Sequence, residues 1–433
     1  MTDQVWLRDY AMLALLIDRL IAVPSGGAVL IYRGPDEWRT QAGAQSPPRP
    51  GRLAEEADRL LDALASEQAP YLVAQIRAMR AVARYLDGER LPLAEYAQQC
   101  LGLRPRPLPE SVFEEAHELL DAALPKTRGS LAERLRAWQR THTLTRMERL
   151  PDLVGRAVAE TRARTETIVT LPADESVGCQ VVGGVSYHAA GHHHGGTEST
   201  IFINGDLPFN LADLLYIVAH EGHPGHIAES LLKERLLVDG QGRADQRVRF
   251  MLSPSFLISE GLGLCAQEIL FPGDEAQTWL AGAVLPEFGI RRDGSDLAAI
   301  HHAKNVLWGV WGNAAFLAAE GSSDARLGDY LARWALYDES EIARTLNLLR
   351  PSVMSPYIFG YVHGWRLVRR WLDAPDRRAR VRRLLTEQLL PADLGRNDDG
   401  GDTASESGYS RPGRSGEAAR GRVAVPSSSR VTP

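Results

Sequence analysis

Apolar residues recur at helical spacing through most of the first 165 positions of the chain. A period near 3.6 residues is typical of helices that bury one face. Two segments, GAVLIYRGPDEW and AQSPPRPG, carry the glycine and proline residues that mark loops. The pattern predicts a helical layer with helices near residues 5–23, 52–66, 68–86, 109–122 and 129–165.

Between residues 168 and 206 the pattern changes to short β-branched runs flanked by glycine. The segments TIVTL, CQVVGGVSY and STIFING have this character, which predicts strands in a small sheet or hairpin. The expected fold class is therefore mainly α, with a small β element. Helical spacing then resumes at residue 210 and predicts long elements near residues 253–270, 274–290, 294–320, 357–372 and 376–390.

The same patterns divide the chain into three regions. Residues 1–167 form the N-terminal helical region, and residues 168–394 combine the β element with helices and hold the candidate chemistry described below. Residues 395–433 are rich in Gly, Ser, Arg and Asp and contain almost no large apolar side chain. Such a segment buries too little apolar surface to offset the entropy lost on ordering, so we expect a disordered tail.

Composition narrows the class of protein. The chain has 433 residues, of which 44% are hydrophobic and 24% charged, as in globular proteins with a large core. A net charge of -6 without a concentrated basic face gives no reason to expect nucleic acid or an anionic membrane as partner. Oligomeric state is not readable from these features.

Cysteine usage and the N-terminus bear on the compartment. Cys100, Cys179 and Cys265 are widely spaced and form no CxxC pair, which favours neither a disulfide framework nor a thiolate metal site. The apolar run near the N-terminus is interrupted by Asp18 and Arg19, unlike a signal peptide, and no stretch approaches the roughly 20 apolar residues of a membrane span. We expect a cytoplasmic protein.

Adjacent His220 and Glu221 carry the main chemical signal. Asn210 is a good N-cap for a helix that delivers them at its end. In zinc peptidases of the HExxH type, a neutral imidazole binds the metal and the neighbouring carboxylate polarises a water molecule. That motif places a second histidine four residues after the first, but Pro224 occupies this position.

Two histidines are candidates for the second ligand. His226 would lie about 120° away from His220 around a straight helix axis. Pro224 lacks an amide proton and Gly225 is conformationally permissive, so the pair can bend the chain and return His226 to the ion. His223 is the alternative, because residues three apart share a helix face.

The segment His220-Glu221-Gly222-His223-Pro224-Gly225-His226 resembles the HExxPGH signature of the DUF885 family, whose uncharacterised proteins are similar to gluzincin peptidases with long-helix folds. Three further segments resemble family elements less specifically, and the similarity covers about residues 170 to 370. Ile227 and Gln267 depart from the family, which often has a second histidine and an acidic residue there. These less specific segments are Glu260–Gln267, which reads EGLGLCAQ where the family has a segment like EGWALYAE, Ile203–Pro208, and Tyr357–Gly360, which resembles the family's YxxG element.

The resemblance implies a gluzincin-like architecture and assigns roles. It favours His226 over His223, since the family position that matches His223 is variable. Two imidazoles and the carboxylate of Glu260 would then hold one Zn²⁺, with Glu221 as general base and later proton donor. Tyr357, expected in the opening turn of a helix after Ser355 and Pro356, would donate to the oxyanion.

The histidine run at residues 192–194 lies between glycines, within residues 187–196. Consecutive histidines cannot all face one ion, and the glycines predict a mobile loop rather than a second metal site. We expect a loop that contacts substrate beside an edge strand at residues 200–204. His301 and His302 are expected to be structural or exposed.

Together these features predict a zinc-dependent hydrolase, a metallopeptidase that acts on short peptides. A non-peptide amide or ester substrate would use the same site. A non-catalytic helical binding protein with a relict site is a further alternative, but the intact Glu221 argues against it.

Overall fold

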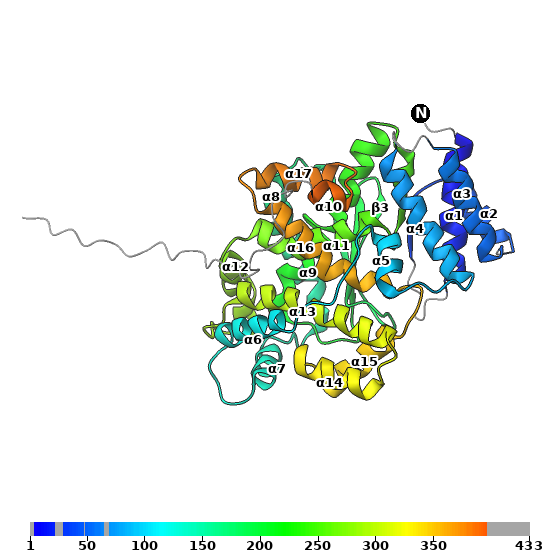
Figure 1. Ribbon diagram of the computed structural model, residues 1–433. Coiled ribbons are helices and arrows are strands. Elements are labelled where there is room, and N and C mark those ends of the chain that lie inside the picture. Colours follow the sequence, from blue (N-terminus) through cyan, green and yellow to red (C-terminus); the bar gives the residue numbers. More distant parts are fainter. Residues whose placement is uncertain (1–3, 22–28, 47, 65–68, 396–433) are drawn as a thin grey trace, which may run out of the picture. The chain divides into compact units, whose positions relative to one another are not determined.

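The computed structural model describes residues 4–21, 29–46, 48–64 and 69–395 (Figure 1). These ranges belong to one compact unit, Met1–Asn397, and the boundary expected near residue 168 falls inside it. The unit is mainly helical and contains two small sheets, which confirms the predicted fold class. Of the expected tail at 395–433, only Gly395, the last residue of a short helix, lies within the described residues.

The N-terminal helices agree in large part with the sequence pattern. The single helix expected over residues 129–165 is instead two helices, because the chain turns after His142 and Pro151 starts a new helix at its first turn. Helices α2 and α5 were not predicted. The N-terminal helices are α1 Gln4–Leu20, α2 Asp36–Ala44, α3 Pro50–Asp62, α4 Pro70–Leu86, α5 Leu93–Leu101, α6 Ser111–Ala123, α7 Leu131–Thr141 and α8 Leu150–Glu166.

The C-terminal helices include two that were not predicted, α14 and α15, which begin at the capping residues Ser323 and Asp338. Among the described residues, no helix is both long and apolar enough to cross a bilayer. The helices are α9 Leu214–Glu221, α10 His226–Lys233, α11 Pro254–Leu270, α12 Glu275–Ala283, α13 Leu297–Ala319, α14 Asp324–Trp334, α15 Glu339–Leu349, α16 Phe359–Leu372, α17 Arg377–Thr386 and α18 Pro391–Gly395. Shorter helical turns are η1 Met147–Arg149, η2 Leu211–Asp213, η3 Glu234–Asp239, η4 Ala244–Arg247, η5 Leu285–Phe288 and η6 Ser355–Ile358.

The strands correct two expectations. The larger sheet has the order β2-β4-β3, with β2 (Ser176–Val182) parallel and β3 (Ala189–Gly195) antiparallel to the central β4 (Glu198–Asn204). The histidine run is therefore an edge strand and not a loop, because the β3 backbone pairs along β4, which was expected at the edge. The smaller sheet pairs β1 (Leu30–Tyr32) with β5 (Val248–Phe250).

The segment TIVTL was expected to be a strand, but it forms the turn that follows α8. Ile168 in this turn is buried, so its apolar side chain serves the core without strand pairing. The expectation was wrong because β-branched residues also suit buried turns.

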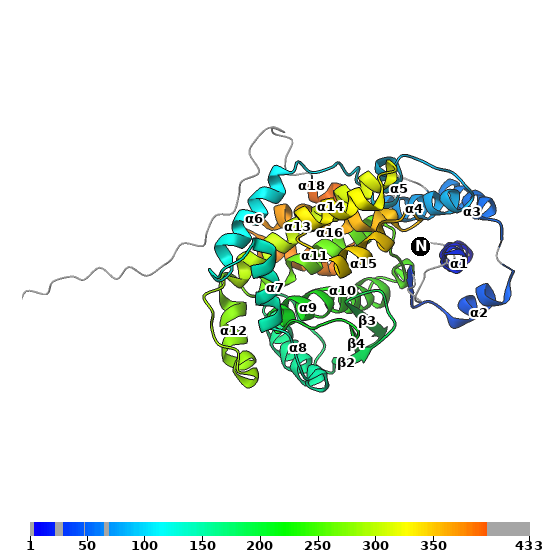
Figure 2. The same ribbon diagram turned by 90° about the horizontal axis from the view of Figure 1, so that it is seen from below.

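Helix α11 occupies the interior, surrounded by α16, α9 and α5 (Figures 1 and 2). Almost all of its residues are buried, as in a helix that is apolar on every side. A glycine pair lets α11 and α16 approach closely. A Cβ on Gly261 would lie 2.2 Å from the Gly364 carbonyl oxygen, and one on Gly364 would lie 2.3 Å from that of Leu257. This contact fixes the depth of Glu260, next to Gly261, in the core.

Candidate metal centre

The segment after α9 interrupts the helix before the next histidine ligand candidate. Helix α9 ends at Glu221 and α10 begins at His226, with Pro224 and Gly225 between them. A Cβ at Gly225 would lie 1.8 Å from the His220 carbonyl oxygen, so only glycine fits there. The break places the rings of His220 and His226 with centroids 4.7 Å apart and planes at 83°. Pro224 and Gly225 thus bend the chain as predicted.

Glu260 reaches the two imidazoles from α11. Its Oε2 lies 3.6 Å from His220 Nε2, and its Oε1 lies 3.8 Å from His226 Nε2. One ligand atom from each residue lies within 4.8 Å of the others. His220 and Glu260 are only 9% and 4% exposed. A cluster of two imidazoles and one carboxylate is thereby formed in the protein interior.

Glycine also makes room for His220 on the side of α11. A Cβ at Gly263 would lie 2.7 Å from His220 Cε1. The imidazole therefore packs directly on the α11 backbone, three residues after Glu260. Burial disfavours the charged form of His220, but Glu221 and Glu260 outweigh this effect and raise its pKa. The two carboxylates thus favour positive charge at this position.

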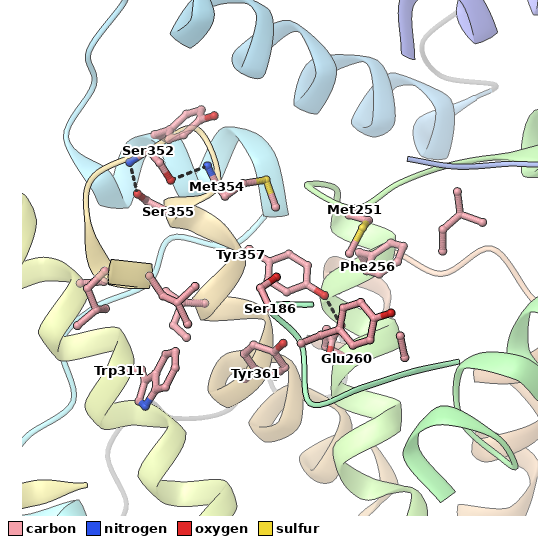
Figure 3. Close-up of a pocket in the computed structure, with 18 of the residues that line it drawn as sticks. Ser186, Met251, Phe256, Glu260, Trp311, Ser352, Met354, Ser355, Tyr357 and Tyr361 are labelled. Carbon is pink, nitrogen blue, oxygen red and sulfur yellow. Dashed lines mark hydrogen bonds between the residues drawn. The ribbon is translucent and has the colours of Figure 1, made fainter. Parts of the chain in front are cut away.

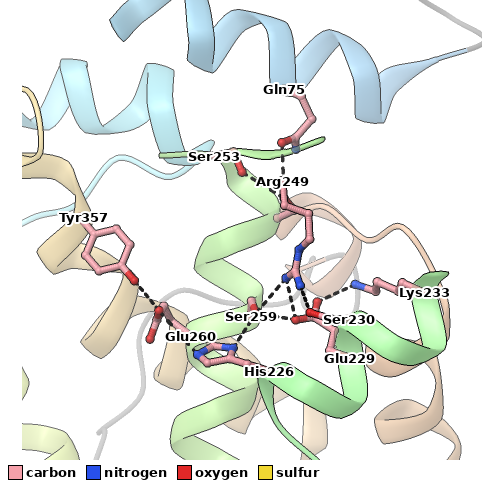
Figure 4. Close-up of polar contacts among 11 residues, drawn as sticks. Gln75, His226, Glu229, Ser230, Lys233, Arg249, Ser253, Ser259, Glu260 and Tyr357 are labelled. Atoms are coloured by element: carbon pink, nitrogen blue, oxygen red, sulfur yellow. Dashed lines mark hydrogen bonds and ion pairs between the residues drawn. The ribbon is translucent and has the colours of Figure 1, made fainter. Parts of the chain in front are cut away.

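A chain of hydrogen bonds behind His226 fixes its tautomer (Figure 4). His226 Nδ1 lies 3.0 Å from Ser259 Oγ, which donates to Glu229 Oε2 at 2.5 Å. Burial raises the pKa of Glu229, but Lys233 and Arg249, at 2.7 and 3.0 Å, outweigh burial and hold this pKa well below its usual value. The ionised carboxylate only accepts, so the Ser259 hydroxyl donates to it and accepts from His226 Nδ1–H.

This arrangement leaves the His226 Nε2 lone pair facing the carboxylate of Glu260. Burial lowers the pKa of His226, so the neutral form is favoured. Glu260 Oε2 is buried and has no hydrogen-bond partner among the described residues. A buried oxygen without a donor is costly, and a cation between these atoms would satisfy it. Tetrahedral zinc with bonds of about 2.1 Å holds its ligand atoms about 3.4 Å apart, and the distances of 3.6 and 3.8 Å from the Glu260 carboxylate to the two imidazoles are close to this spacing.

His223 does not belong to this group. It is fully buried, and its Nε2 lies 2.8 Å from Glu175 Oε1. Burial raises the pKa of Glu175, but His223 and Arg162 outweigh burial and hold it below its usual value. The side chain of His223 therefore anchors the segment between α9 and α10 to the residue before β2, and His226 is the histidine that the structure brings to His220 and Glu260.

Glu221 lies beside the cluster and is held by the edge strand. The Gly191 amide donates to Glu221 Oε2 at 2.7 Å. A Cβ at Gly191 would lie 2.2 Å from the Glu221 carbonyl oxygen, so strand β3 approaches the end of α9 through a glycine. The carboxylate lines the same cavity as the three clustered residues.

Tyr357 is part of the cluster in this structure (Figure 3). It lies in η6, the turn before α16, rather than in a helix capped by Ser355. Its phenol donates to Glu260 Oε1 at 2.6 Å. Burial and the neighbouring Glu260 raise the pKa of Tyr357 well above its usual value, so the phenol keeps its proton.

The cluster opens into a cavity of about 810 Å³, a size typical of sites for small ligands. Strand β3 contributes Ala189–His192 to one wall. Of the histidine run, only His192 lines the cavity, because His193 bonds to Glu234 and His194 to Thr200.

Sequence reasoning missed the support behind the cluster. Ser259, Glu229 and Arg249 were not singled out, although Ser259 precedes Glu260 and Glu229 lies three residues after His226. Gln267, where the DUF885 pattern has an acidic residue, bonds to His301, which in turn bonds to Asp213 directly before α9. His301 is therefore structural, as expected.

Comparison with known proteins gives little further guidance. No protein-family model matches the chain, and no curated protein matches it. A solved structure, described as a "putative lipoprotein" from Colwellia psychrerythraea, shares 14% identity with a TM-score of 0.49. The match covers 79% of this chain and 65% of that one, so the chain spans less than two thirds of the length of that protein. At this level the likeness carries no argument about activity.

Proposed function

We propose that this protein is a zinc-dependent hydrolase that cleaves short peptides, with His220, His226 and Glu260 as ligands of one ion. The observation that supports this best is the buried cluster in which the Glu260 carboxylate lies close to two imidazoles and its Oε2 accepts no hydrogen bond from the described residues. The placement of Glu221 beside the cluster, on the wall of a ligand-sized cavity, adds the proton-transfer group that hydrolysis requires.

Each residue has a distinct task in the proposed reaction. Bound zinc would act as a Lewis acid and lower the pKa of a water molecule at its open position. Glu221 accepts the proton of the attacking water and returns it to the leaving amine. Because the Gly191 amide donates to Oε2 of Glu221, the other carboxylate oxygen, Oε1, remains to carry out this proton transfer. The Tyr357 hydroxyl, now on Glu260, turns toward the oxyanion as it develops.

We also propose a family relationship and a cellular compartment for this protein. We infer a relationship to the DUF885 proteins from the HEGHPGH segment and the placement of Glu260 beside it. We also expect the cytoplasm as the compartment, since Cys100, Cys179 and Cys265 are free thiols.

The test combines metal analysis with one substitution at the base. We expect about one zinc per chain after purification with zinc and dialysis. Glu221→Gln should keep the metal and lose cleavage of a mixed peptide library by about 100- to 10,000-fold. Glu115→Gln, an exposed glutamate on α6, is the matched control and should cleave as the wild type does. Absence of bound zinc, or unimpaired cleavage by Glu221→Gln, contradicts the proposal.

A further inference from the structure

The cavity continues past Tyr357 into an arm with apolar walls, here called the apolar arm. The charged residues that line the cavity in the described chain are Arg90, Glu221, Arg249 and Glu260, and α13, α15 and η6 contribute none of them. The arm lies between α13, α15 and the residues around η6. Its apolar lining residues include Trp311, Ala315, Ala319, Leu348, Met354 and Ile358, and Ser352 and Ser355 also line the cavity near η6.

The apolar arm starts directly at the candidate metal centre. Tyr357 touches Glu260, and the Tyr361 ring centroid lies 5.7 Å from that of Tyr357. Tyr361 stacks on Trp308 at 4.4 Å, and Trp308 lies 5.4 Å from Trp311. Figure 3 shows Trp311 on the far side of Tyr357 and Tyr361 from Glu260. The side chains of Tyr357 and Tyr361 therefore lie between the candidate metal centre and Trp311 in the arm.

Small residues on α13 keep this space open. Trp311, Ala315 and Ala319 follow each other at intervals of four and so form one stripe of the helix, which lines the cavity. The neighbouring stripe packs against α16, where the rings of Phe316 and Phe359 lie 5.1 Å apart. Ala315 is 6% exposed and Ala319 is exposed, so the stripe runs from the interior to the cavity mouth. Larger side chains at these positions would fill the arm.

We infer that the apolar arm binds a large apolar side chain next to the scissile bond, and that the substrates are short peptides with such a residue. This inference rests on the proposed hydrolase function. An uncharged wall lined by tryptophan, leucine and methionine favours removal of an aromatic or long aliphatic group from water and disfavours a charged one. Ala315 and Ala319 determine the specificity by leaving the arm empty.

The first measurement compares peptides that differ at one residue. Ala-X-Ala-Ala peptides with X as Phe, Leu, Gly or Asp, with free and with blocked termini, are incubated with the zinc-loaded full chain. Cleavage on either side of X is followed by mass spectrometry. We expect kcat/KM for Phe and Leu to exceed that for Gly and Asp by about tenfold or more. Equal cleavage of the four peptides overturns the apolar arm and leaves the hydrolase standing.

Substitutions then connect the preference to the arm. Ala319→Trp, at the exposed mouth, and Ala315→Leu, deeper in the arm, should each reduce the ratio of kcat/KM for Phe over Gly by about tenfold. Glu320→Trp places the same bulk on the adjacent exposed position, which does not line the cavity, and should keep the ratio. An unchanged ratio in folded Ala319→Trp protein overturns the inference, and thermal unfolding verifies that all three variants are folded.

Binding separates failure of the arm from failure of the hydrolase. Zinc-loaded Glu221→Gln protein is titrated calorimetrically with the blocked Phe and Gly peptides, for which turnover is not needed. Tighter binding of the Phe peptide by about tenfold, lost in Ala319→Trp, supports the arm even when the wild type cleaves none of the peptides. Selective binding of the Phe peptide without any cleavage would reject the hydrolase function and keep the apolar arm. Equal affinities reject the apolar arm.

Discussion

At the scale of single residues, His223 and His226 belong to one short segment but lie in different surroundings. His226 faces Glu260, whereas His223 is buried against Glu175. We expect His226→Gln to lose most of the bound zinc, because it removes one of three proposed ligands. His223→Gln should keep the metal, since an amide can still donate to Glu175. Metal content after dialysis decides this, and zinc loss in His223→Gln alone would reverse the ligand assignment.

Ser259 gives a second prediction at this scale. Its hydroxyl joins His226 Nδ1 to Glu229 and so fixes the tautomer that presents Nε2. Ser259→Ala should weaken zinc binding by about 10- to 100-fold, because the imidazole loses the acceptor that orients it. The measurement is a competition titration against a chelator of known affinity.

The matched control for this titration is Ser255→Ala on the same helix. Ser255 bonds to Ser253 and Gln75 and makes no contact with the cluster. We expect its zinc affinity to equal that of the wild type. Equal affinities in all three proteins would show that Ser259 does not position the imidazole.

These residues also mark how far sequence reasoning reaches at the residue scale. His220, Glu221 and His226 were recognisable because they lie close together in a dense pattern. Ser259, Glu229 and Arg249 form one network only where α10, α11 and β5 meet, and no spacing in the chain encodes that meeting. Serine and arginine are too common for either to be singled out without it.

At the scale of elements, the contact of α11 with α16 sets the position of Glu260. A Cβ at Gly364 would lie 2.3 Å from the Leu257 carbonyl oxygen, which belongs to rigid helix backbone. We expect Gly364→Ala to reduce the free energy of unfolding by about 1–3 kcal/mol, the usual effect of overpacking. It should also weaken zinc binding, because α11 shifts with Glu260. Urea unfolding and metal titration measure the two effects.

Gly155 is the control for that substitution. It is an exposed glycine inside α8, and a Cβ there meets no atom within 4 Å. Gly155→Ala should stabilise the protein by about 0.5–1 kcal/mol, since alanine loses less backbone entropy in a helix. A similar loss of stability in both variants would mean that the close approach of α11 and α16 is not what makes glycine necessary.

The elements were predicted best where one periodic pattern dominates. Helix α11 was located almost to the residue from the helical spacing of its apolar residues. The histidine run of β3 was not recognised as a strand, because the glycines around it have low strand preference and the pairing with β4 forms the strand. The break between α7 and α8 was missed because the helical spacing of apolar residues continues across the turn that separates them.

At the scale of the whole molecule, two half-buried histidines outside the cluster, His302 and His363, make stability depend on pH. Burial and Arg369 lower the pKa of His302 to about 4, and burial and Arg366 lower that of His363 to about 4. Both lie below the unfolded value of about 6.5. Above that pH, both states are neutral. As pH falls from about 6.5 to 4, only the unfolded state binds the proton, so the free energy of unfolding decreases.

The expected loss is up to about 1.4 kcal/mol per pH unit for each histidine. Urea unfolding at pH 7 and pH 5 measures this loss of unfolding free energy. The protein is first treated with a chelator, because protons compete with zinc for the histidine ligands and would add a second pH dependence. His226 and His301 also have lowered pKa values and contribute in the same range, so the wild type alone does not isolate the pair. In the double variant His302→Gln/His363→Gln, the free energy of unfolding should fall between pH 7 and pH 5 by about 2–4 kcal/mol less than in the wild type. Equal dependence would mean that both imidazoles become protonated within the folded protein near their ordinary pKa.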